Sequence, residues 1–317
     1  MEKRNLGIPL QLDLALTPRV NRSATERRAK TLTTRRSVKK EHQAAWLLKA
    51  ITMIDLTTLD GMDTPQRVAR LCAKGKQPVR QDILEALGMG NKGLTVGAIC
   101  VYPNRVRDAV AALRGTNIPV AAVATGFPSG QMPVPPQLDD IEKLIETGAQ
   151  EIDIVISREH VHMGNWEALY DEIRAYRQAC GDGAHLKTII ETGELGTLTN
   201  VYRASMICMM AGADFIKTST GKAKVNATLP FGLIMCRAIR DYHALTGNMV
   251  GYKPAGGISK AKDGLNWLIL IKEELGDAWL NNHYFRFGAS SLLADIERQL
   301  SHHVTRRYAS SKYMPLA

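Results

Sequence analysis

Two lysines lie five residues apart in the stretch DFIKTSTGK, residues 214–222. Lys217 falls inside an apolar-flanked run that is typical of a β-strand, where a charged side chain is costly to bury. Lys222 instead follows a glycine and a run of small hydroxyl residues. Other ionisable residues occupy similar apolar runs, namely Asp55, Asp153, Lys187 and Lys253. We therefore expect these charges either to pair with one another or to include a neutral lysine.

A neutral lysine is a nucleophile. An isolated ammonium has a pKa of ~10.4, so few lysines carry a free amine at neutral pH. A neighbouring ammonium and removal from water both lower that pKa, and the free amine then attacks an aldehyde or ketone to form a Schiff base. Lys217 and Lys253, beside Asp153, are the candidates for such a pair. The alternative, that each lysine extends to solvent at the rim of the fold, fits three lysines in successive runs less well.

Three glycine-rich segments in the last third of the chain, TSTGK, PAGG and GASS, each stand at the end of an apolar run. Glycines let backbone N–H groups approach an anion, although they also occur in ordinary turns. We expect a phosphate site built from Gly221, Lys222, Gly256, Gly257, Gly288, Ser290 and Ser291. The segment STGK is not a nucleotide P-loop, because Ile216 and Ala223 stand where that motif requires glycine and a hydroxyl residue.

Eight β-rich runs alternate with helical patterns after about residue 43. They cover residues 51–57, 94–103, 119–128, 151–157, 185–192, 214–220, 249–257 and 285–291. Eight such units predict an α/β fold, a (β/α)8 TIM barrel with an N-terminal helical extension, whose active site lies at the carboxyl ends of the strands. An open doubly wound sheet is the alternative, but no nucleotide fingerprint follows the first run. Helices are predicted over 165–180, with Asn165 as N-cap, and over 41–50, covering the barrel floor.

Charge is distributed unevenly along the 317 residues. Of the net charge of +10, the first 49 residues carry +8, with 12 Lys and Arg against 4 Asp and Glu. We divide the chain into a basic arm (1–40), a barrel (41–307) and a tail (308–317). The arm could bind a polyanion or be a transit peptide, but a solvated surface helix is the favoured interpretation.

Composition excludes several classes of protein. No apolar run is long enough for a membrane span, and we expect a cytoplasmic protein. The five cysteines are widely spaced, and the eight histidines show no metal-ligand spacing. We therefore expect neither a disulfide framework nor a metal, and no cofactor.

The motifs together resemble those of the deoxyribose-phosphate aldolases, a family of class I aldolases. The resemblance covers about residues 40–307 and rests, in chain order, on IDLT, CVYP, GFPSG, EIDIVI, HLKTIIETGEL, DFIKTSTGK, YKPAGGI and FGASSLL. The basic arm is similar to that of the longer members of the family. The resemblance implies reversible cleavage of 2-deoxy-D-ribose 5-phosphate into D-glyceraldehyde 3-phosphate and acetaldehyde, a step of deoxyribonucleotide catabolism.

The resemblance also implies roles for individual residues. Lys217 would form the Schiff base, Lys253 would lower its pKa, and Asp153 would transfer protons. The predicted substrate contacts are Asp55, Thr57, Cys100, Lys187 and Thr220, and the phosphate residues are those given above. In the family a C-terminal tyrosine can reach the site, and the sequence leaves open which of Tyr308 and Tyr313, if either, does so here.

Two other functions remain open from the sequence. Another class I aldolase would use the same lysine chemistry on a different donor. A barrel that serves only as a scaffold, with the arm binding RNA or a partner, is the non-enzymatic alternative. We expect a phosphorylated sugar as substrate, no nucleic-acid partner, and a homo-oligomer whose size the sequence leaves open.

Overall fold

The computed structural model of the chain describes residues 4–310 and 313–314. The centre of this described part is a parallel sheet of seven short strands that follow one another in sequence order. The strands are β1 (Asp55–Thr57), β2 (Ala98–Val101), β3 (Val120–Val123), β4 (Glu151–Val155), β5 (His185–Ile189), β6 (Phe215–Lys217) and β7 (Gly251–Lys253). The α/β class and the parallel strand order predicted from the alternating pattern are thereby confirmed.

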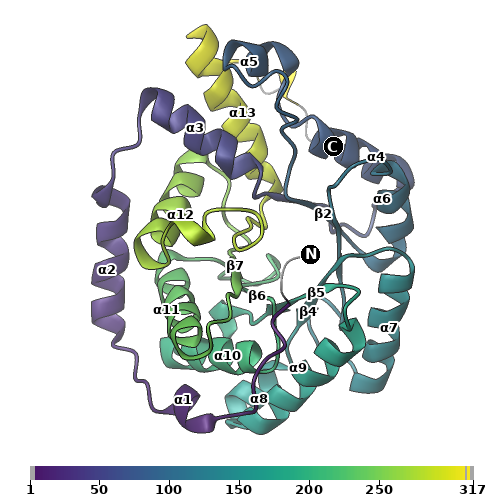
Figure 1. Cartoon of the computed structure of the whole chain (residues 1–317), viewed down its shortest axis with the longest axis vertical. Coiled ribbons are helices and arrows are strands. Elements are labelled where there is room, and N and C mark those ends of the chain that lie inside the picture. Colours follow the sequence, from purple (N-terminus) through teal and green to yellow (C-terminus); the bar gives the residue numbers. More distant parts are fainter. Residues whose placement is uncertain (1–3, 311–312, 315–317) are drawn as a thin grey trace.

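Helices surround the curled sheet on its outer side (Figure 1). The helices are α1 (Leu12–Leu16), α2 (Arg22–Arg35), α3 (Lys40–Ile51), α4 (Pro65–Lys76), α5 (Gln81–Ala86), α6 (Val106–Ala112), α7 (Val134–Glu146), α8 (Arg158–Met163), α9 (Trp166–Cys180), α10 (Leu198–Met210), α11 (Leu229–Thr246), α12 (Ala261–Glu274) and α13 (Ser290–Thr305). The helix predicted over 165–180 is α9, and the side chain of Asn165 caps it by accepting the N–H of Ala168. Apolar residues at three- and four-residue spacing turn one face of α9 toward the sheet.

Residues 284–288 lie between the two edges of the sheet. On the β7 side, the N–H of Arg286 donates to the carbonyl of Tyr252. On the β1 side, the N–H of Asp55 donates to the carbonyl of Phe287. Through these bonds the first and last strands are joined in space, and the carboxyl ends of all the strands meet at one end of the curled sheet.

The prediction of a regular eighth strand over 285–291 was wrong. This run forms isolated bridges, such as Phe285 with Tyr252, and then enters α13 at Ser290. It thus pairs with its neighbours through single bridges and not through a continuous ladder. The first run, 51–57, is also shorter than predicted, because α3 continues to Ile51 and the strand begins only at Asp55. Apolar residues are buried in either conformation, so their pattern did not distinguish helix from strand here.

The two faces of the strands bury different kinds of side chain. On β4, Ile152 and Ile154 belong to the main apolar core, which lies between the sheet and the helices. Side chains alternate along a strand, so Glu151 and Asp153 occupy the opposite, inner face. The apolar residues of that inner face form a separate small cluster of Cys100, Ala121 and Val123. The interior of the curled sheet is therefore largely polar, although it is closed to water.

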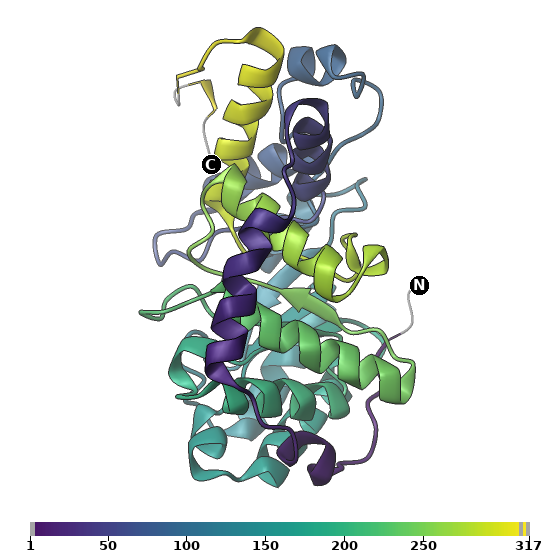
Figure 2. The same ribbon diagram turned by 90° about the vertical axis from the view of Figure 1, so that its left-hand side faces the viewer.

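The N-terminal segments pack on the outside of the molecule. Helix α2 crosses α11 and α12, as Figure 2 shows. Helix α3 confirms the helix predicted over 41–50, but it packs beside α12 and α13 and not over the barrel floor. Residues 5–8 instead reach the amino ends of the strands, where the N–H of Asn5 donates to Asp214.

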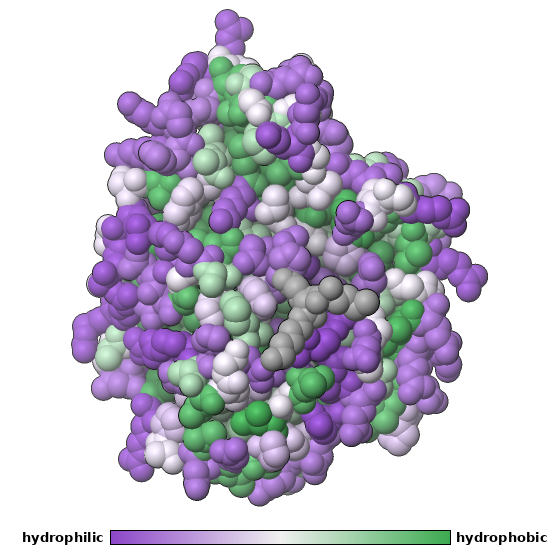
Figure 3. Space-filling view, viewed as in Figure 1, coloured by the Kyte–Doolittle hydropathy of each residue, from purple (hydrophilic) through white to green (hydrophobic). Residues whose placement is uncertain are grey.

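The face viewed in Figure 1 carries mostly hydrophilic side chains, with hydrophobic ones in scattered groups (Figure 3). Within the described residues, no helix is both long enough and apolar enough to cross a bilayer.

Candidate active site

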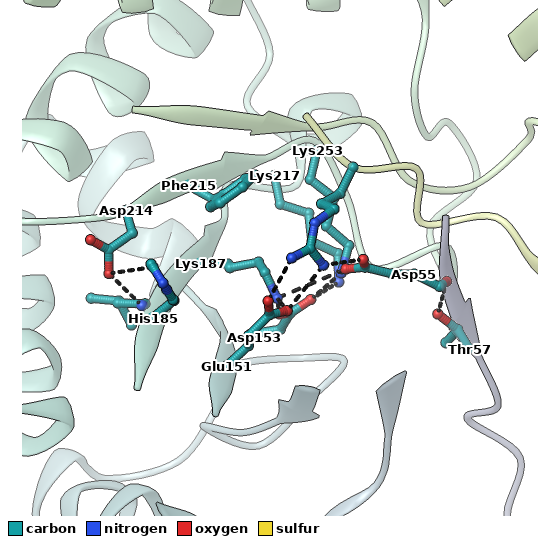
Figure 4. A network of polar contacts seen from close by, with 12 residues as sticks. Asp55, Thr57, Glu151, Asp153, His185, Lys187, Asp214, Phe215, Lys217 and Lys253 are labelled. Carbon is teal, nitrogen blue, oxygen red and sulfur yellow. Dashed lines mark hydrogen bonds and ion pairs between the residues drawn. The ribbon is translucent and has the colours of Figure 1, made fainter. Parts of the chain in front are cut away.

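Lys217 and Lys253 lie side by side at the carboxyl ends of β6 and β7. They are direct partners in the register of these strands, so their side chains point to the same inner face. Both amines reach one atom, Oδ2 of Asp153, and each Nζ–Oδ2 distance is 2.7 Å. Figure 4 shows the two side chains converging on this carboxylate from neighbouring strands. The juxtaposition that Schiff-base chemistry requires is thus present in the fold.

Five further ionisable side chains complete a continuous buried network around this pair. Its other members are Asp153 and Glu151 from β4, Lys187 from β5, Asp55 from β1, and Arg286 from the segment between β7 and α13. Strand register again explains the meeting, because Asp153 and Lys187 are direct partners of β4 and β5. The seven side chains are each no more than 6% exposed, so the network is shielded from water.

The contacts within the network are short. Lys187 lies 2.8 Å from Oδ1 of Asp153 and 2.5 Å from Oε2 of Glu151. Arg286 lies 2.6 Å from Asp55 and 2.8 Å from Glu151. Lys253 forms a second ion pair, 2.5 Å long, with Oδ2 of Asp55. Among the carboxylates of the described residues, only Asp153 therefore forms ion pairs with all three lysines of the network.

Glu151 and Arg286 were not among the residues predicted from the sequence. A signal for Glu151 was available, since it precedes Asp153 by two positions in EIDIV and must share its face of the strand. Arg286 stands between two phenylalanines in FRFGASS, which indicates a buried cation. The partners of these two residues are far away in sequence, and only the folded chain shows them.

The charges of the network do not balance when every group is ionised. Four bases, Lys187, Lys217, Lys253 and Arg286, face three acids, Asp55, Glu151 and Asp153. An uncompensated charge in a closed interior is strongly unfavourable. Loss of one proton from one lysine would bring the seven groups to neutrality.

The pKa directions differ among the lysines of the network. Burial lowers the pKa of Lys217, and the cation of Lys253 adds to the effect against the attraction of Asp153. Burial also opposes the charge of Lys253, but Asp153 and Asp55 outweigh it and raise its pKa. Burial likewise opposes the charge of Asp153, but the three lysines outweigh it and hold its pKa well below the usual range. Lys217 is therefore the amine most readily freed, beside an ammonium and a carboxylate that keep their charges.

The remaining predicted substrate contacts surround this network. Cys100 lies on the inner face of β2, and burial raises the pKa of its thiol. The hydroxyl of Thr57 donates to the carbonyl of Asp55. The hydroxyl of Thr220 accepts the N–H of Lys222, which shapes the loop after β6. Both hydroxyls thus hold the backbone close to the ionisable groups.

The glycine-rich segments predicted to bind phosphate come together at the carboxyl end of the strands. Gly221, Gly256 and Gly257 all have φ near +80°, which favours glycine. A Cβ on Gly221 would lie 3.8 Å from the Cα of Gly256, so the loops after β6 and β7 are neighbours. A Cβ on Gly288 would lie 2.7 Å from the Cβ of Ala255, so the third segment adjoins the second.

The charged and hydroxyl members of the predicted phosphate set are placed less uniformly. Lys222 is exposed, and its amine donates to the carbonyl of Leu59 at 3.0 Å. The hydroxyl of Ser290 accepts the N–H of Thr57 and donates to its carbonyl, so it ties α13 to β1. Ser291 is exposed in the first turn of α13, where backbone N–H groups are free to bind an anion.

Neither tyrosine of the tail lies in the lysine network. The ring of Tyr308 stacks on that of His302 at 4.3 Å, and this tyrosine is 81% exposed. Tyr313 is 67% exposed. Both rings therefore face solvent in this structure.

Comparison with known proteins agrees with the resemblance seen in the motifs. Residues 49–296 match the model of a family described as DeoC/LacD family aldolase. Curated proteins named deoxyribose-phosphate aldolase are 60% identical in Homo sapiens and 59% identical in Bos taurus, over all of this chain and all of each relative. In both relatives the match includes the basic arm.

Solved structures share the fold at much lower sequence identity. A deoxyribose phosphate aldolase from Aeropyrum pernix, described as a unique tetramer, superposes with a TM-score of 0.61 at 20% identity, covering 89% of this chain and 99% of that one. An aldolase named QR15 gives a TM-score of 0.61 at 22% identity, covering 81% of this chain and 99% of that one.

Proposed function

The chain belongs to the DeoC/LacD family of aldolases, and we propose that it cleaves 2-deoxy-D-ribose 5-phosphate reversibly into D-glyceraldehyde 3-phosphate and acetaldehyde. The name of the human relative, 60% identical over the full length, supports this substrate. The observation that carries the proposal is the contact of two buried amines, Lys217 and Lys253, with one oxygen of Asp153. This arrangement supplies a nucleophilic amine and a proton carrier in a site closed to water.

The reaction begins with Lys217. Its free amine adds to the C1 aldehyde of the open-chain sugar, and loss of water from the carbinolamine gives a protonated Schiff base. This cation accepts the electron pair of the C2–C3 bond as that bond breaks. The C3 hydroxyl gives up its proton, and glyceraldehyde 3-phosphate leaves. Protonation of the remaining enamine at carbon, followed by hydrolysis, releases acetaldehyde and restores the amine.

Asp153 and Lys253 manage protons and charge during these steps. Asp153 touches the amine of Lys217, so it can accept and return protons of the carbinolamine, directly or through a water molecule. Lys253 stays protonated, because Asp153 and Asp55 hold its charge, and it therefore keeps the pKa of Lys217 low. Asp55 and Lys187 extend the polar network, and Thr57, Cys100 and Thr220 line the substrate side.

The phosphate is assigned to the carboxyl-end loops. The backbone N–H groups of Gly221, Gly256, Gly257, Gly288, Ser290 and Ser291 would bind its oxygens. Lys222 would leave the carbonyl of Leu59 and supply the countercharge. The positive φ of the glycines after β6 and β7, and the free N–H groups at the start of α13, support this assignment.

Some wider properties belong to the same proposal. We treat the architecture as a (β/α)8 barrel with an N-terminal helical extension, whose eighth strand is the segment 284–288; hydrogen bonds from this segment to both sheet edges support the assignment. We keep the division into arm (1–40), barrel (41–307) and tail (308–317), and we propose a cytoplasmic homo-oligomer. The tetramer described for the Aeropyrum pernix protein supports only the general tendency to assemble.

Borohydride trapping tests the proposal. Incubation with acetaldehyde and borohydride should add one reduced two-carbon adduct to the intact mass, and peptide mapping should place it on Lys217. The substitution Lys217→Ala should abolish both the adduct and the cleavage of 2-deoxyribose 5-phosphate. An adduct formed only with a larger ketone would assign the protein to another class I aldolase, and the absence of any adduct would overturn the Schiff-base mechanism.

A further inference from the structure

The buried network contains two residues that the proposed chemistry does not use, Arg286 and Glu151. They lie at the opposite end of the network from the reacting amine. Both line a cavity of about 460 Å³ at the amino ends of the strands, together with residues such as Gly97 and Pro119 that precede β2 and β3. A substrate bound at the carboxyl ends of the strands would not touch them. Their burial among charged groups therefore calls for another explanation than substrate contact.

Arg286 forms ion pairs with two of the three carboxylates of the network. Its guanidinium contacts Oδ1 of Asp55 and both oxygens of Glu151, at distances of 2.6, 3.3 and 2.8 Å. A guanidinium is effectively always charged in proteins, so Arg286 compensates part of the charge of these carboxylates at every pH of interest. Lys187 also pairs with Glu151 and Asp55, and Lys253 pairs with Asp55. Both lysines also form an ion pair with Asp153.

The distribution of contacts leaves Lys217 with the smallest share of negative charge. Lys187 and Lys253 each contact at least two carboxylates, and Arg286 contacts two. Among the described ion pairs, Lys217 has only the one with Oδ2 of Asp153, an oxygen that it shares with Lys253, while Lys187 contacts Oδ1 of the same carboxylate. The excess of one base over the acids therefore falls on Lys217.

We propose that Arg286 and Glu151 are positioning residues that set the charge balance of the network, so that the unprotonated base is Lys217 and no other lysine. The inference rests on the proposed function, because it explains how that function obtains its free amine. Arg286 acts through its ion pairs with Asp55 and Glu151, because they leave less negative charge for the lysines. Glu151 acts in the opposite direction, because its negative charge compensates the cations of Arg286 and Lys187.

The elements packed around Lys217 differ in the charge that they contribute to this balance. Charged groups face it from β1, β4, β5, β7 and the segment 284–288, and β2 supplies the Cys100 thiol, whose pKa burial raises. Strand β3 contributes the uncharged Ala121 and Val123.

Arg286 has further neighbours at the amino end of the strands. It donates from Nε to the carbonyl of Asn282 and lies 5.9 Å from the ring centre of Phe215. The cavity beside it also contains the ionisable residues Arg4, Asp182, His185 and His283. Burial lowers the pKa of His185 to about 4, so it is neutral at neutral pH. Arg4 and Asp182 carry one charge of each sign, so this pair leaves the base excess of the network unchanged.

Substitutions of the two residues should shift the pKa of Lys217 in opposite directions. Arg286→Gln leaves three bases against three acids, so all three lysines can stay protonated. The pKa of Lys217 should rise, and the acidic limb of kcat/KM against pH for 2-deoxyribose 5-phosphate should move up by about 1 pH unit. Glu151→Gln leaves four bases against two acids, and the same limb should move to lower pH. The double variant restores an excess of one base, and its limb should return close to that of the unaltered protein.

Controls separate charge balance from loss of structure. Arg286→Lys keeps a cation and should restore the position of the limb. Arg177→Gln removes another buried ion pair, Arg177–Asp214 at 2.6 Å, outside the network; it should lower Tm without moving the limb. Thermal unfolding confirms that each variant is folded at the assay pH. If Arg286→Gln does not fold, Glu151→Gln carries the test alone, and an unmoved limb overturns the inference.

The outcomes also distinguish this inference from the proposed function. Trapping and turnover by the unaltered protein test the function. If they occur but both single variants keep the original limb, or move it in the same direction, the charge-balance role is overturned while the aldolase assignment stands. Opposite shifts with recovery in the double variant support the role. If the unaltered protein neither turns over nor forms the adduct, the function itself fails, and this inference fails with it.

Discussion

At the scale of single residues, the proposed chemistry depends on a difference between two neighbouring lysines. Lys217 and Lys253 occupy equivalent positions on adjacent strands and share one oxygen of Asp153. Lys253 also pairs with Asp55, so its charge is held, whereas the charge of Lys217 is opposed by burial and by its neighbour. In the proposed mechanism, this additional carboxylate contact makes Lys253 the permanent cation and leaves Lys217 as the nucleophile.

The substitution Lys253→Leu tests this difference. It removes the cation that lowers the pKa of Lys217, so that pKa should rise toward the ordinary value. Since the amine reacts only above its pKa, the acidic limb of kcat/KM should move to higher pH, and the rate at neutral pH should fall by roughly tenfold or more. Lys253→Arg retains the cation and serves as the control. A pH profile of Lys253→Leu that coincides with that of the unaltered protein would show that Lys253 does not lower the pKa of Lys217.

At the scale of elements, parallel strands bring distant loops to one end of the sheet. The loop after β6 contains Gly221 and Lys222 and touches the loop after β1 through the hydrogen bond from Lys222 to the carbonyl of Leu59. The loop after β7 lies beside it at Gly256. Strand alternation aims the lysines inward, and the turns that follow each strand surround the mouth above them. The amine of Lys217 and the proposed phosphate loops therefore face the same space.

The substitution Lys222→Ala tests the role of these loops. Loss of one charge-assisted hydrogen bond to phosphate should raise KM for 2-deoxyribose 5-phosphate by about tenfold or more and change kcat little. The constants for unphosphorylated 2-deoxyribose should not change. Lys224→Ala removes an exposed lysine of the same loop and is the matched control. Equal effects on the two sugars would contradict a phosphate role for Lys222.

At the scale of the whole molecule, the basic arm is part of the packed structure. Helix α2 crosses α11 and α12 on the outer surface (Figure 2). Arg28 pairs with Glu274 at 2.8 Å, and Arg36 pairs with Glu273 at 2.7 Å. Some of the positive charge that stands out in the sequence is therefore compensated by carboxylates of α12. These contacts agree with the interpretation of the arm as a surface helix.

The substitution Leu32→Ala measures what this packing contributes. Leu32 of α2 is fully buried, and its truncation should lower the free energy of unfolding by about 2–5 kcal/mol. Because α2 lies outside the lysine network, kcat and KM should be unchanged at temperatures where the variant is folded. Thr34→Ala, at an exposed position of the same helix, should change the stability by less than about 0.5 kcal/mol. Urea unfolding of both variants measures these changes. Equal losses of unfolding free energy in the two variants, or no loss in either, would contradict a stabilising role for the arm.

The sequence by itself determined the alternation of strands and helices, the capped helix α9, and the placement of Lys187, Lys217 and Lys253 in strands. These features depend on local periodicity, residue type and turn residues, all of which a linear chain displays. The carboxyl-end location of the glycine segments followed from the same alternation. The exact extent of the first and eighth runs did not, because apolar residues are buried in helix and strand alike.

Only the tertiary structure decided how the buried charges are paired. Arg286 and Glu151 are 135 residues apart, and the hydroxyl of Ser290 meets the backbone of Thr57 across 233 residues. Hydrophobic periodicity specifies which face of an element is buried, but it does not specify which distant residue meets that face. Strand register and the curling of the sheet bring these groups together, and the proposed charge balance around Lys217 depends on that meeting.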